Sequence, residues 1–117
     1  QDEVEKACEV FEENHKLTDG LVVLKIFSAL PFAEQAKAFD SASEGSRKLI
    51  ISTNVAETSL TIPGIYYVID AGYAKLKMFG PKSGIETLDL LPISQASADQ
   101  RAGRAGKDFL HQIVEFN

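Results

Sequence analysis

Several residue types are scarce in this 117-residue chain, and each shortage excludes a class of protein. The single cysteine, Cys8, excludes an internal disulfide and a zinc site built on several thiolates. No apolar run approaches the roughly 20 residues that a membrane-spanning helix needs. The first residues are acidic and lack the apolar stretch of a secretory signal peptide. The sequence therefore fits a protein of a reducing compartment that does not span a membrane.

An excess of positive charge is also missing, since the net charge is −5. This argues against a protein that binds nucleic acid by electrostatic attraction alone. The imbalance lies in residues 1–20, where seven acids face two lysines, whereas the rest of the chain carries ten of each sign. The plainest interpretation of the acidic run is a solvated helix face, and a docking face for a partner is the alternative.

Continuous apolar runs define the expected secondary structure. Apolar residues at helical spacing predict a helix over residues 2–16. Proline at the start of residues 31–39 suits the first turn of a second helix. Three strands are expected, over residues 21–27, 48–52 and 65–70. Strands without polar alternation are typical of parallel sheets that helices cover on both faces, so the predicted class is α/β.

The segment 75–91 has a different pattern. Residues 75–79 and 85–91 flank a stretch rich in glycine and proline, which predicts a β-hairpin. Lys75 and Lys77 alternate with apolar residues, so one face of this hairpin is expected to be polar. A hairpin of this length is expected to protrude from the sheet.

A polar segment, residues 52–64, follows the second strand. In open α/β sheets, ligands bind at the carboxyl ends of the strands. Hydroxyl and amide side chains of the kind gathered here bind phosphate and sugar oxygens. The alternative interpretation is a capped turn, because Asn54, Thr58 and Ser59 are all residue types that cap short helices.

A second polar segment, residues 94–107, contains a predicted helix. Ser94 or Ser97 is expected to cap its start. Gly103 and Gly106 each cost roughly 1 kcal/mol inside a helix relative to alanine. That cost indicates a purpose, either close packing or a fraying helix end that brings basic groups near a ligand.

Three polar residues of this segment are spaced for one helix face: Gln100, Arg104 and Lys107. The planar guanidinium of arginine binds phosphate oxygens through two hydrogen bonds. An arginine presented across an interface stabilises the charge of a phosphoryl-transfer transition state. A solvated basic helix is the alternative that the residues alone leave open.

At these segments the sequence closely resembles the second RecA-like domain of the DEAH-box (DEAH/RHA) ATP-dependent RNA helicases. STNVAETSLTI (52–62) resembles motif V of that family, and QRAGRAGK (100–107) resembles its motif VI. IFSALP (26–31) resembles motif IV, and residues 1–3 resemble the tail of motif IVa. The resemblance covers residues 1–107, a partial RecA-like domain of parallel sheet, flanking helices and hairpin. Residues 108–117 diverge from the family, and they are either a substitute strand at 113–116 or a junction or variant terminus.

The resemblance implies roles for nine residues. In motif VI, the residues that face the triphosphate match Gln100, Arg104 and Lys107. Further contacts to the nucleotide match Ser59, Thr61 and Phe39, with Phe39 stacking on the base or, alternatively, serving as a core aromatic. Contacts to RNA match Ser28, Thr53 and Asn54. In the family, the hairpin parts or guides nucleic acid strands.

Two residues depart from the family pattern. Lys107 stands where arginine is usual, which keeps the charge but loses the two-pronged contact to phosphate. Pro63 stands where aspartate or another polar residue is common, which puts a ribose contact in doubt.

The resemblance also implies parts beyond these residues. The sequence has no GxxxxGK[ST] phosphate loop and no DEAH motif for magnesium, which the family keeps in its first RecA-like domain. The chain is therefore expected to be incomplete at both ends and inactive alone. The intact parent is expected to use ATP with Mg²⁺ to unwind or translocate along RNA, in the nucleus or cytoplasm. Its partners are expected to be RNA, the first RecA-like domain and the C-terminal helicase-associated domains, with room for a protein activator.

Two other functions are alternatives to a helicase motor domain. One is a catalytically inactive truncation product that binds RNA or a protein partner. The other is a generic nucleotide-binding domain of the flavodoxin type. The lack of a glycine-rich phosphate loop after any predicted strand argues against the second.

Overall fold

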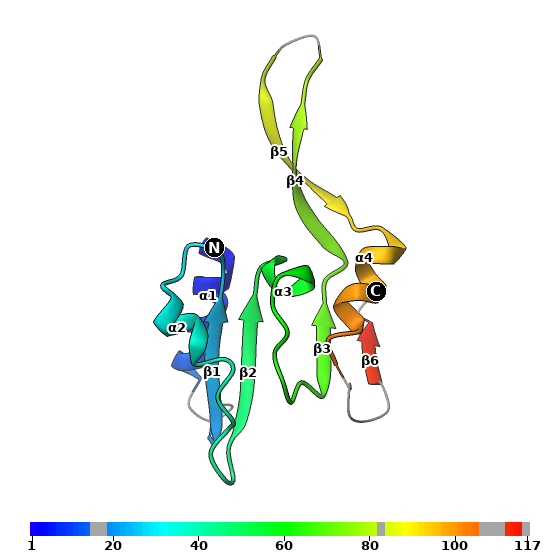
Figure 1. Ribbon diagram of the computed structural model, residues 1–117. Coiled ribbons are helices and arrows are strands. Elements are labelled where there is room, and N and C mark those ends of the chain that lie inside the picture. Colours follow the sequence, from blue (N-terminus) through cyan, green and yellow to red (C-terminus); the bar gives the residue numbers. More distant parts are fainter. Residues whose placement is uncertain (15–18, 82–83, 106–111, 116–117) are drawn as a thin grey trace. The chain divides into compact units, whose positions relative to one another are not determined.

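The computed structural model describes residues 1–14, 19–81, 84–105 and 112–115, with backbone alone for the last range (Figure 1). The chain divides into two compact units, Gln1–Gly64 and Ile65–Asn117. The first unit holds α1 (Asp2–Glu13), β1 (Leu21–Ile26), α2 (Phe32–Ala36), β2 (Arg47–Ser52) and α3 (Val55–Thr58). The second holds β3 (Tyr67–Asp70), β4 (Tyr73–Phe79), β5 (Glu86–Pro92), α4 (Gln95–Ala102) and β6 (Gln112–Glu115).

The first unit is built on a parallel pair of strands, β1 and β2. Leu21 lies opposite Arg47, and Ile26 lies opposite Ser52. The chain enters β1 through Gly20, whose φ of 71° is a conformation that side chains with a Cβ rarely adopt. The carbonyl of Gly20 then accepts a hydrogen bond of 2.8 Å from the Arg47 backbone N–H. Both strands therefore start together and end at the same edge of the sheet.

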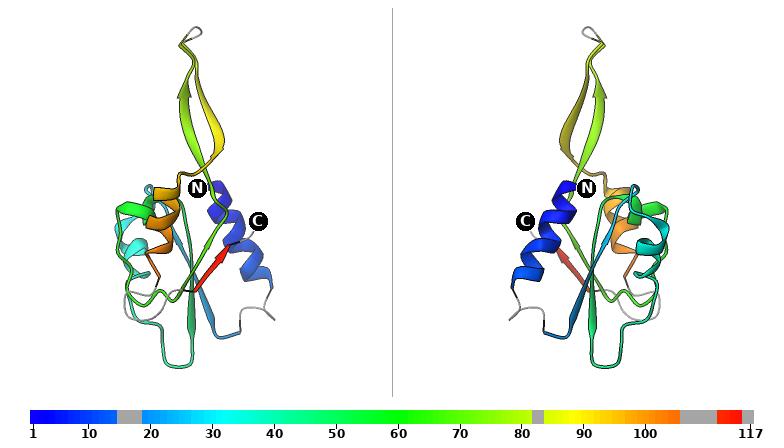
Figure 2. Two further views of the ribbon diagram at one scale, coloured as in Figure 1. Left: turned by 90° about the vertical axis from the view of Figure 1, so that its right-hand side faces the viewer. Right: turned by 90° about the vertical axis from the view of Figure 1, so that its left-hand side faces the viewer.

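Helix α1 covers one face of this pair, and α2 and α3 lie on the other side (Figure 2). Val4 and Cys8 of α1 pack with Phe27 and Leu30, the two buried residues that follow β1. Val23 of β1 and Ile51 of β2 border this cluster. The amphipathic pattern read in the sequence thus gives the helix its buried face, and the acidic residues lie on the exposed one.

The strands of this unit are less buried than their apolar runs predicted. Among the described residues of β1 and β2, only Ile26 is fully buried, and Val22 is 43% exposed. Helices therefore lie on both faces of this pair, as expected, but the strands are only partly buried, which was not expected. The physical reason is that α2 and α3 are five and four residues long and contribute no buried side chain.

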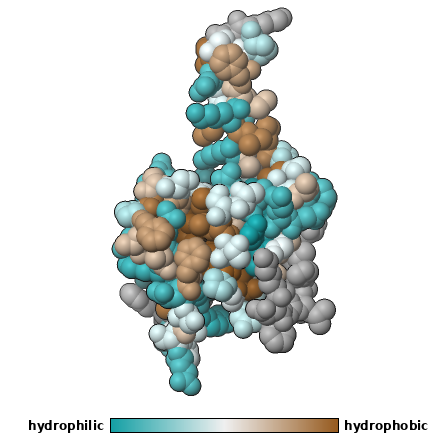
Figure 3. All heavy atoms as spheres, in the orientation of Figure 1, coloured by the Kyte–Doolittle hydropathy of each residue, from teal (hydrophilic) through white to brown (hydrophobic). Residues whose placement is uncertain are grey.

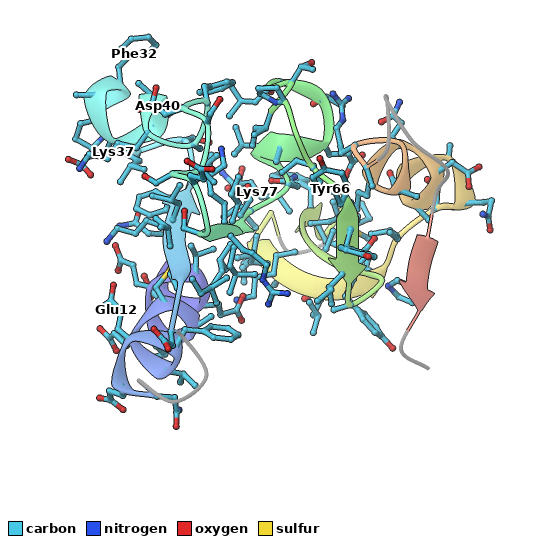
Figure 4. All side chains as sticks on the ribbon, turned by 90° about the horizontal axis from the view of Figure 1, so that it is seen from below. Glu12, Phe32, Lys37, Asp40, Tyr66 and Lys77 are labelled. Carbon is cyan, nitrogen blue, oxygen red and sulfur yellow. The ribbon has the colours of Figure 1, made fainter. Side chains whose placement is uncertain are left out.

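Helix α2 is shorter than predicted. It ends at Ala36, and the chain continues in tight turns, with the N–H of Phe39 donating to the Ala36 carbonyl at 2.9 Å. Pro31 occupies the position just before the helix, and Phe32 is 85% exposed and projects away from it (Figure 4).

In the second unit, β3 pairs in parallel with β6, with Tyr67 opposite Gln112. The predicted strand over 65–70 begins two residues later than expected, at Tyr67. Strand β6 spans most of the expected 113–116, and residue 116 lies outside the described residues. Tyr67 and Ile69 are 65% and 71% exposed, so β3 also has an uncovered face.

Strands β4 and β5 form the predicted hairpin, which extends well beyond β3 and α4 of its unit (Figure 1). It is longer than expected, since pairing begins at Tyr73 opposite Pro92. Apolar side chains gather along it (Figure 3), and those that are exposed are Tyr73, Leu76, Met78, Phe79, Ile85, Leu88 and Leu90. The α/β class with a protruding hairpin is therefore confirmed. Across the described ranges, none of the helices has the length and apolarity to cross a bilayer.

Candidate nucleotide and RNA site

The first polar segment leaves the carboxyl end of β2. The N–H of Thr53 donates to the Ile26 carbonyl at 3.1 Å, which extends the β1–β2 pairing by one residue. Asn54 then occupies the position before α3. Because β1 and β2 end in register, Asn54 and the exposed Ser28 follow neighbouring strand ends at one edge of the sheet. The structure thus brings together Ser28, Thr53 and Asn54, the three candidates for RNA contact.

The structure supports only part of the alternative interpretation, in which polar residues of the segment 52–64 cap a short helix. A short helix does form over Val55–Thr58. The side chain of Asn54 makes no capping hydrogen bond to it, and it is exposed. Ser59 stands at the C-terminal end of α3, where it has no role as an N-terminal cap. The polar side chains of this segment are therefore not explained by helix capping.

The nucleotide candidates of the first unit are at its surface. Ser59 and Thr61 are exposed. Phe39 is 37% exposed, next to Ala38, which is almost completely buried. The partial exposure of the ring contradicts the alternative of a core aromatic and leaves one part of it accessible for stacking.

In the second unit, α4 begins at the predicted cap. The Ser94 side chain accepts a hydrogen bond of 3.1 Å from the backbone N–H of Ser97, which decides between the two serines. Gln100 lies exposed on the last turn of this helix. Its neighbour Arg101 points elsewhere and is described below.

Helix α4 ends earlier than the spacing of the polar residues implied. It stops at Ala102, and the N–H of Arg104 bonds to the Arg101 carbonyl in a tighter turn, at 3.1 Å. Gly103 forms the C-terminal cap of the helix with a right-handed φ of −65°, and its N–H donates to the Asp99 carbonyl at 2.8 Å. The prediction that Gln100, Arg104 and Lys107 share a helix face is therefore wrong for Arg104, and Lys107 lies outside the described residues. Of the two purposes considered for the glycines, Gly103 fits a helix end.

Arg104 is half-buried at this helix end, and Ala105 after it is buried. Partial burial restricts the directions that the Arg104 guanidinium can take. A restricted guanidinium loses less entropy when it binds a phosphate than one on a free surface chain.

A residue that sequence reasoning missed anchors α4. Arg101 Nη1 lies 2.8 Å from Asp70 Oδ1 at the end of β3, and the two side chains are 16% and 24% exposed. The same nitrogen donates to the Tyr73 carbonyl at 3.3 Å, while Asp70 Oδ1 also accepts from the Gly72 N–H at 2.9 Å. This ion pair fixes the helix that carries Gln100 to the β3–β4 junction. The available signal was an aspartate at the end of a predicted strand, directly before a glycine turn.

Cys8 is set apart from these polar segments, inside the core of the first unit. Burial raises the pKa of its thiol, Lys25 opposes the shift, and Glu12, Glu5 and Glu9 add to it. A raised pKa keeps the thiol protonated and unreactive at neutral pH. Within the described ranges, no cluster of three histidine, cysteine, aspartate or glutamate residues is arranged to bind a metal ion.

Comparisons with known proteins agree with the motifs. The model of the helicase conserved C-terminal domain matches residues 1–108. A probable ATP-dependent RNA helicase DHX35 homolog of Caenorhabditis elegans is 54% identical over 110 residues, which cover 92% of this chain and 15% of the relative. The pre-mRNA-splicing factor ATP-dependent RNA helicase prp22 of Schizosaccharomyces pombe is 49% identical over 111 residues, 92% of this chain and 10% of the relative.

A solved structure is similar over nearly the whole chain. The DExH-box NTPase HrpB of E. coli superposes with a TM-score of 0.86 at 35% identity, and the match covers 97% of this chain. It covers 14% of the HrpB chain. The chain therefore spans a small part of each of these proteins, and within that part the sequence and the fold agree.

Proposed function

The chain belongs to the helicase conserved C-terminal domain family, and on this basis we propose that it is the second motor domain of an ATP-dependent DEAH-box RNA helicase. Family membership confirms the resemblance read from motifs V and VI. The proposed domain works with a first RecA-like domain, so that a nucleotide lies between the two and RNA runs across both. Its proposed location is the nucleus or the cytoplasm.

The observation that best supports this function is the end of α4. Gln100 is exposed on its last turn, Arg104 follows in the next turn, and the Arg101–Asp70 ion pair fixes the helix. In the proposal, Gln100, Arg104 and Lys107 face the triphosphate held by the other domain. A positioned guanidinium stabilises the charge that develops on the transferred phosphoryl group.

The other candidates divide by location in the first unit. Ser28, Thr53 and Asn54, at one edge of the β1–β2 sheet, contact the RNA backbone in the proposal. Ser59 and Thr61 contact the nucleotide, and Phe39 stacks on its base. Hydroxyl and amide contacts of this kind hold a strand without reading its sequence, as a translocating motor requires.

The proposed cofactor is ATP with Mg²⁺. When bound, the ion neutralises charge on the β- and γ-phosphates. Because the sequence contains no phosphate loop, the proposal assigns magnesium binding to the first RecA-like domain. This chain contributes the arginine and glutamine that complete the site. Its other proposed partners are RNA, the helicase-associated domains and a protein activator.

The test is the Arg104→Ala variant of the full-length protein that carries this sequence. Loss of an arginine finger is expected to lower RNA-stimulated ATP hydrolysis by about 10³- to 10⁵-fold. The matched control is Arg47→Ala, which removes an exposed arginine from the start of β2 and is expected to retain wild-type turnover. Unchanged hydrolysis in Arg104→Ala would refute the role given to this residue.

A catalytically inactive truncation product that binds RNA or a protein partner is the second candidate, and a cellular protein of this length would favour it. The isolated chain is expected to hydrolyse no ATP under either proposal. The two differ in the length of the protein that cells make, which an immunoblot with an antibody against this chain measures. Detection of the full-length helicase alone would exclude the second candidate.

A further inference from the structure

Lys48 holds the backbone on both sides of Phe39. It is the second residue of β2 and is half-buried. Its Nζ donates to the Ala38 carbonyl at 2.7 Å and to the Asp40 carbonyl at 2.5 Å. One ammonium group on β2 thus forms hydrogen bonds to the residue before Phe39 and to the residue after it.

These two contacts add to the backbone hydrogen bonds of the segment, in which the Ala38 N–H donates to the Gln35 carbonyl at 3.1 Å and the Phe39 N–H donates to the Ala36 carbonyl at 2.9 Å. Helix α2 has ended at Ala36, and Asp40 lies at the surface (Figure 4). Hydrogen bonds from a charged donor are about twice as strong as neutral ones. Ala38 is 1% exposed, so the chain is also anchored by packing just before Phe39. The backbone of Phe39 is therefore fixed on both sides, whereas its ring is partly exposed.

The ammonium has few donors left for a ligand. A lysine has three N–H donors, and two of them bond to the Ala38 and Asp40 carbonyls. Lys48 also differs in burial from other lysines of the chain, since Lys48 is half-buried whereas Lys25 on β1 is exposed. Because the Lys48 ammonium bonds to backbone carbonyls of the protein, its geometry is that of a group that supports the neighbouring Phe39.

We propose that Lys48 is a positioning residue for the nucleotide base, because it fixes the segment 38–40 and thereby the orientation of the Phe39 ring. The inference rests on the proposed stacking of Phe39 on the base. Stacking requires the face of the Phe39 ring to be aligned with the base. A segment 38–40 that is free to move therefore lowers the affinity for ATP even when the ring is present. The contribution of Lys48 is therefore expected for ligands with a base and not for the phosphates alone.

The experiment uses the full-length protein and two probes, ATP and inorganic tripolyphosphate, which has no base. Lys48→Met is expected to weaken ATP binding by about 5- to 20-fold, a part of what base stacking on an aromatic contributes. Tripolyphosphate binding is expected to stay within about twofold of wild type, since it lacks the stacking contact. In ATP hydrolysis, KM is expected to rise while kcat at saturating ATP is retained.

Four further variants sharpen the test: two at other positions or with another side chain, Phe39→Ala, and a double variant. Lys48→Arg keeps charged donors that reach the carbonyls and is expected to bind ATP as wild type does. Lys25→Met removes an exposed lysine from the adjacent strand and is the matched control. In Phe39→Ala, where the ring is gone, adding Lys48→Met is expected to change ATP affinity less than twofold, because coupled residues are not additive.

The outcomes separate this inference from the function on which it rests. If Phe39→Ala binds ATP as wild type does, the proposed stacking fails, and the inference fails with it. If Phe39→Ala weakens ATP binding and Lys48→Met does not, the inference alone is overturned. Equal losses for ATP and tripolyphosphate, or fully additive losses in the double variant, would also overturn it. If Lys48→Met does not fold, Lys48→Gln replaces it, and selective loss for ATP is again the required result.

Discussion

The ion pair between Arg101 and Asp70 can be tested by a pair of substitutions. Replacing Arg101 with methionine keeps much of the apolar stem and removes the guanidinium that bonds to Asp70 and to the Tyr73 carbonyl. Exposed ion pairs contribute about 0–1 kcal/mol, whereas removing one partner of a fully buried pair costs about 3–5 kcal/mol. With side chains 16% and 24% exposed, this pair lies between those limits, and we expect a cost of about 2 kcal/mol.

That cost is expected as local opening of α4, because Arg101 joins this helix to β3. A change of about 2 kcal/mol corresponds to roughly 30-fold faster exchange of the helix amides, since 1.4 kcal/mol is a factor of ten. Hydrogen exchange followed by mass spectrometry on peptides from α4 measures this directly. Asp70→Asn keeps an oxygen for the Gly72 N–H and removes the charge, and it is expected to show the same direction of change.

A control variant and a double variant test whether the faster amide exchange in α4 comes from loss of the Arg101–Asp70 ion pair. Arg47→Met, at an exposed position on β2, is expected to leave exchange in α4 unchanged. In the double variant of Arg101 and Asp70, the loss is expected to be smaller than the sum of the single losses, because both substitutions remove one interaction. Exchange in α4 that matches wild type in Arg101→Met, or additive losses, would refute the anchoring role.

Two more predictions concern the start of α4 and the core cysteine. Ser94→Ala is expected to destabilise the helix by about 1 kcal/mol, seen as faster amide exchange in its first turn, whereas Ser94→Asp keeps an acceptor for the Ser97 N–H and matches wild type. For Cys8, whose folded pKa is raised above the unfolded value by burial, stability is fully present below the unfolded thiol pKa of about 8.5 and declines as pH rises above it. Urea midpoints between pH 7 and 10 are expected to show this decline in the wild type and less of it in Cys8→Ala; equal slopes would contradict the assignment.

The elements of the fold follow closely from local sequence patterns. Apolar runs placed β1 and β2, helical spacing placed α1, and the glycine- and proline-rich turn placed the hairpin, each to within a few residues. The predicted ends of the helices were less accurate, because packing and backbone geometry decide where a helix ends and a local sequence pattern does not contain them. Arg104 illustrates this, since its N–H donates to the Arg101 carbonyl at 3.1 Å, a change of hydrogen-bond pattern that residue spacing alone does not reveal.

The exposure of polar residues in the candidate site was predictable from the sequence, and the residues that support them were not. Exposed polar residues such as Gln100 and Asn54 stand out between apolar runs, and motif resemblance gives them roles. Arg101 and Lys48 are as polar as these residues, yet both are turned toward the protein, where they bond to Asp70 and to backbone carbonyls. Which direction a charged side chain takes depends on partners far away in the sequence, so residue type does not decide it.

The pairing of β3 with β6 has a consequence for how the chain folds as it is synthesised. Leu21 meets Arg47 in the first unit, and the hairpin strands lie close together in sequence, so both can close early. Tyr67, by contrast, meets Gln112, which lies 45 residues further along the chain. The edge of β3 that pairs with β6 is therefore open until residues 112–115 have been synthesised, and during that interval it can mispair with other strands.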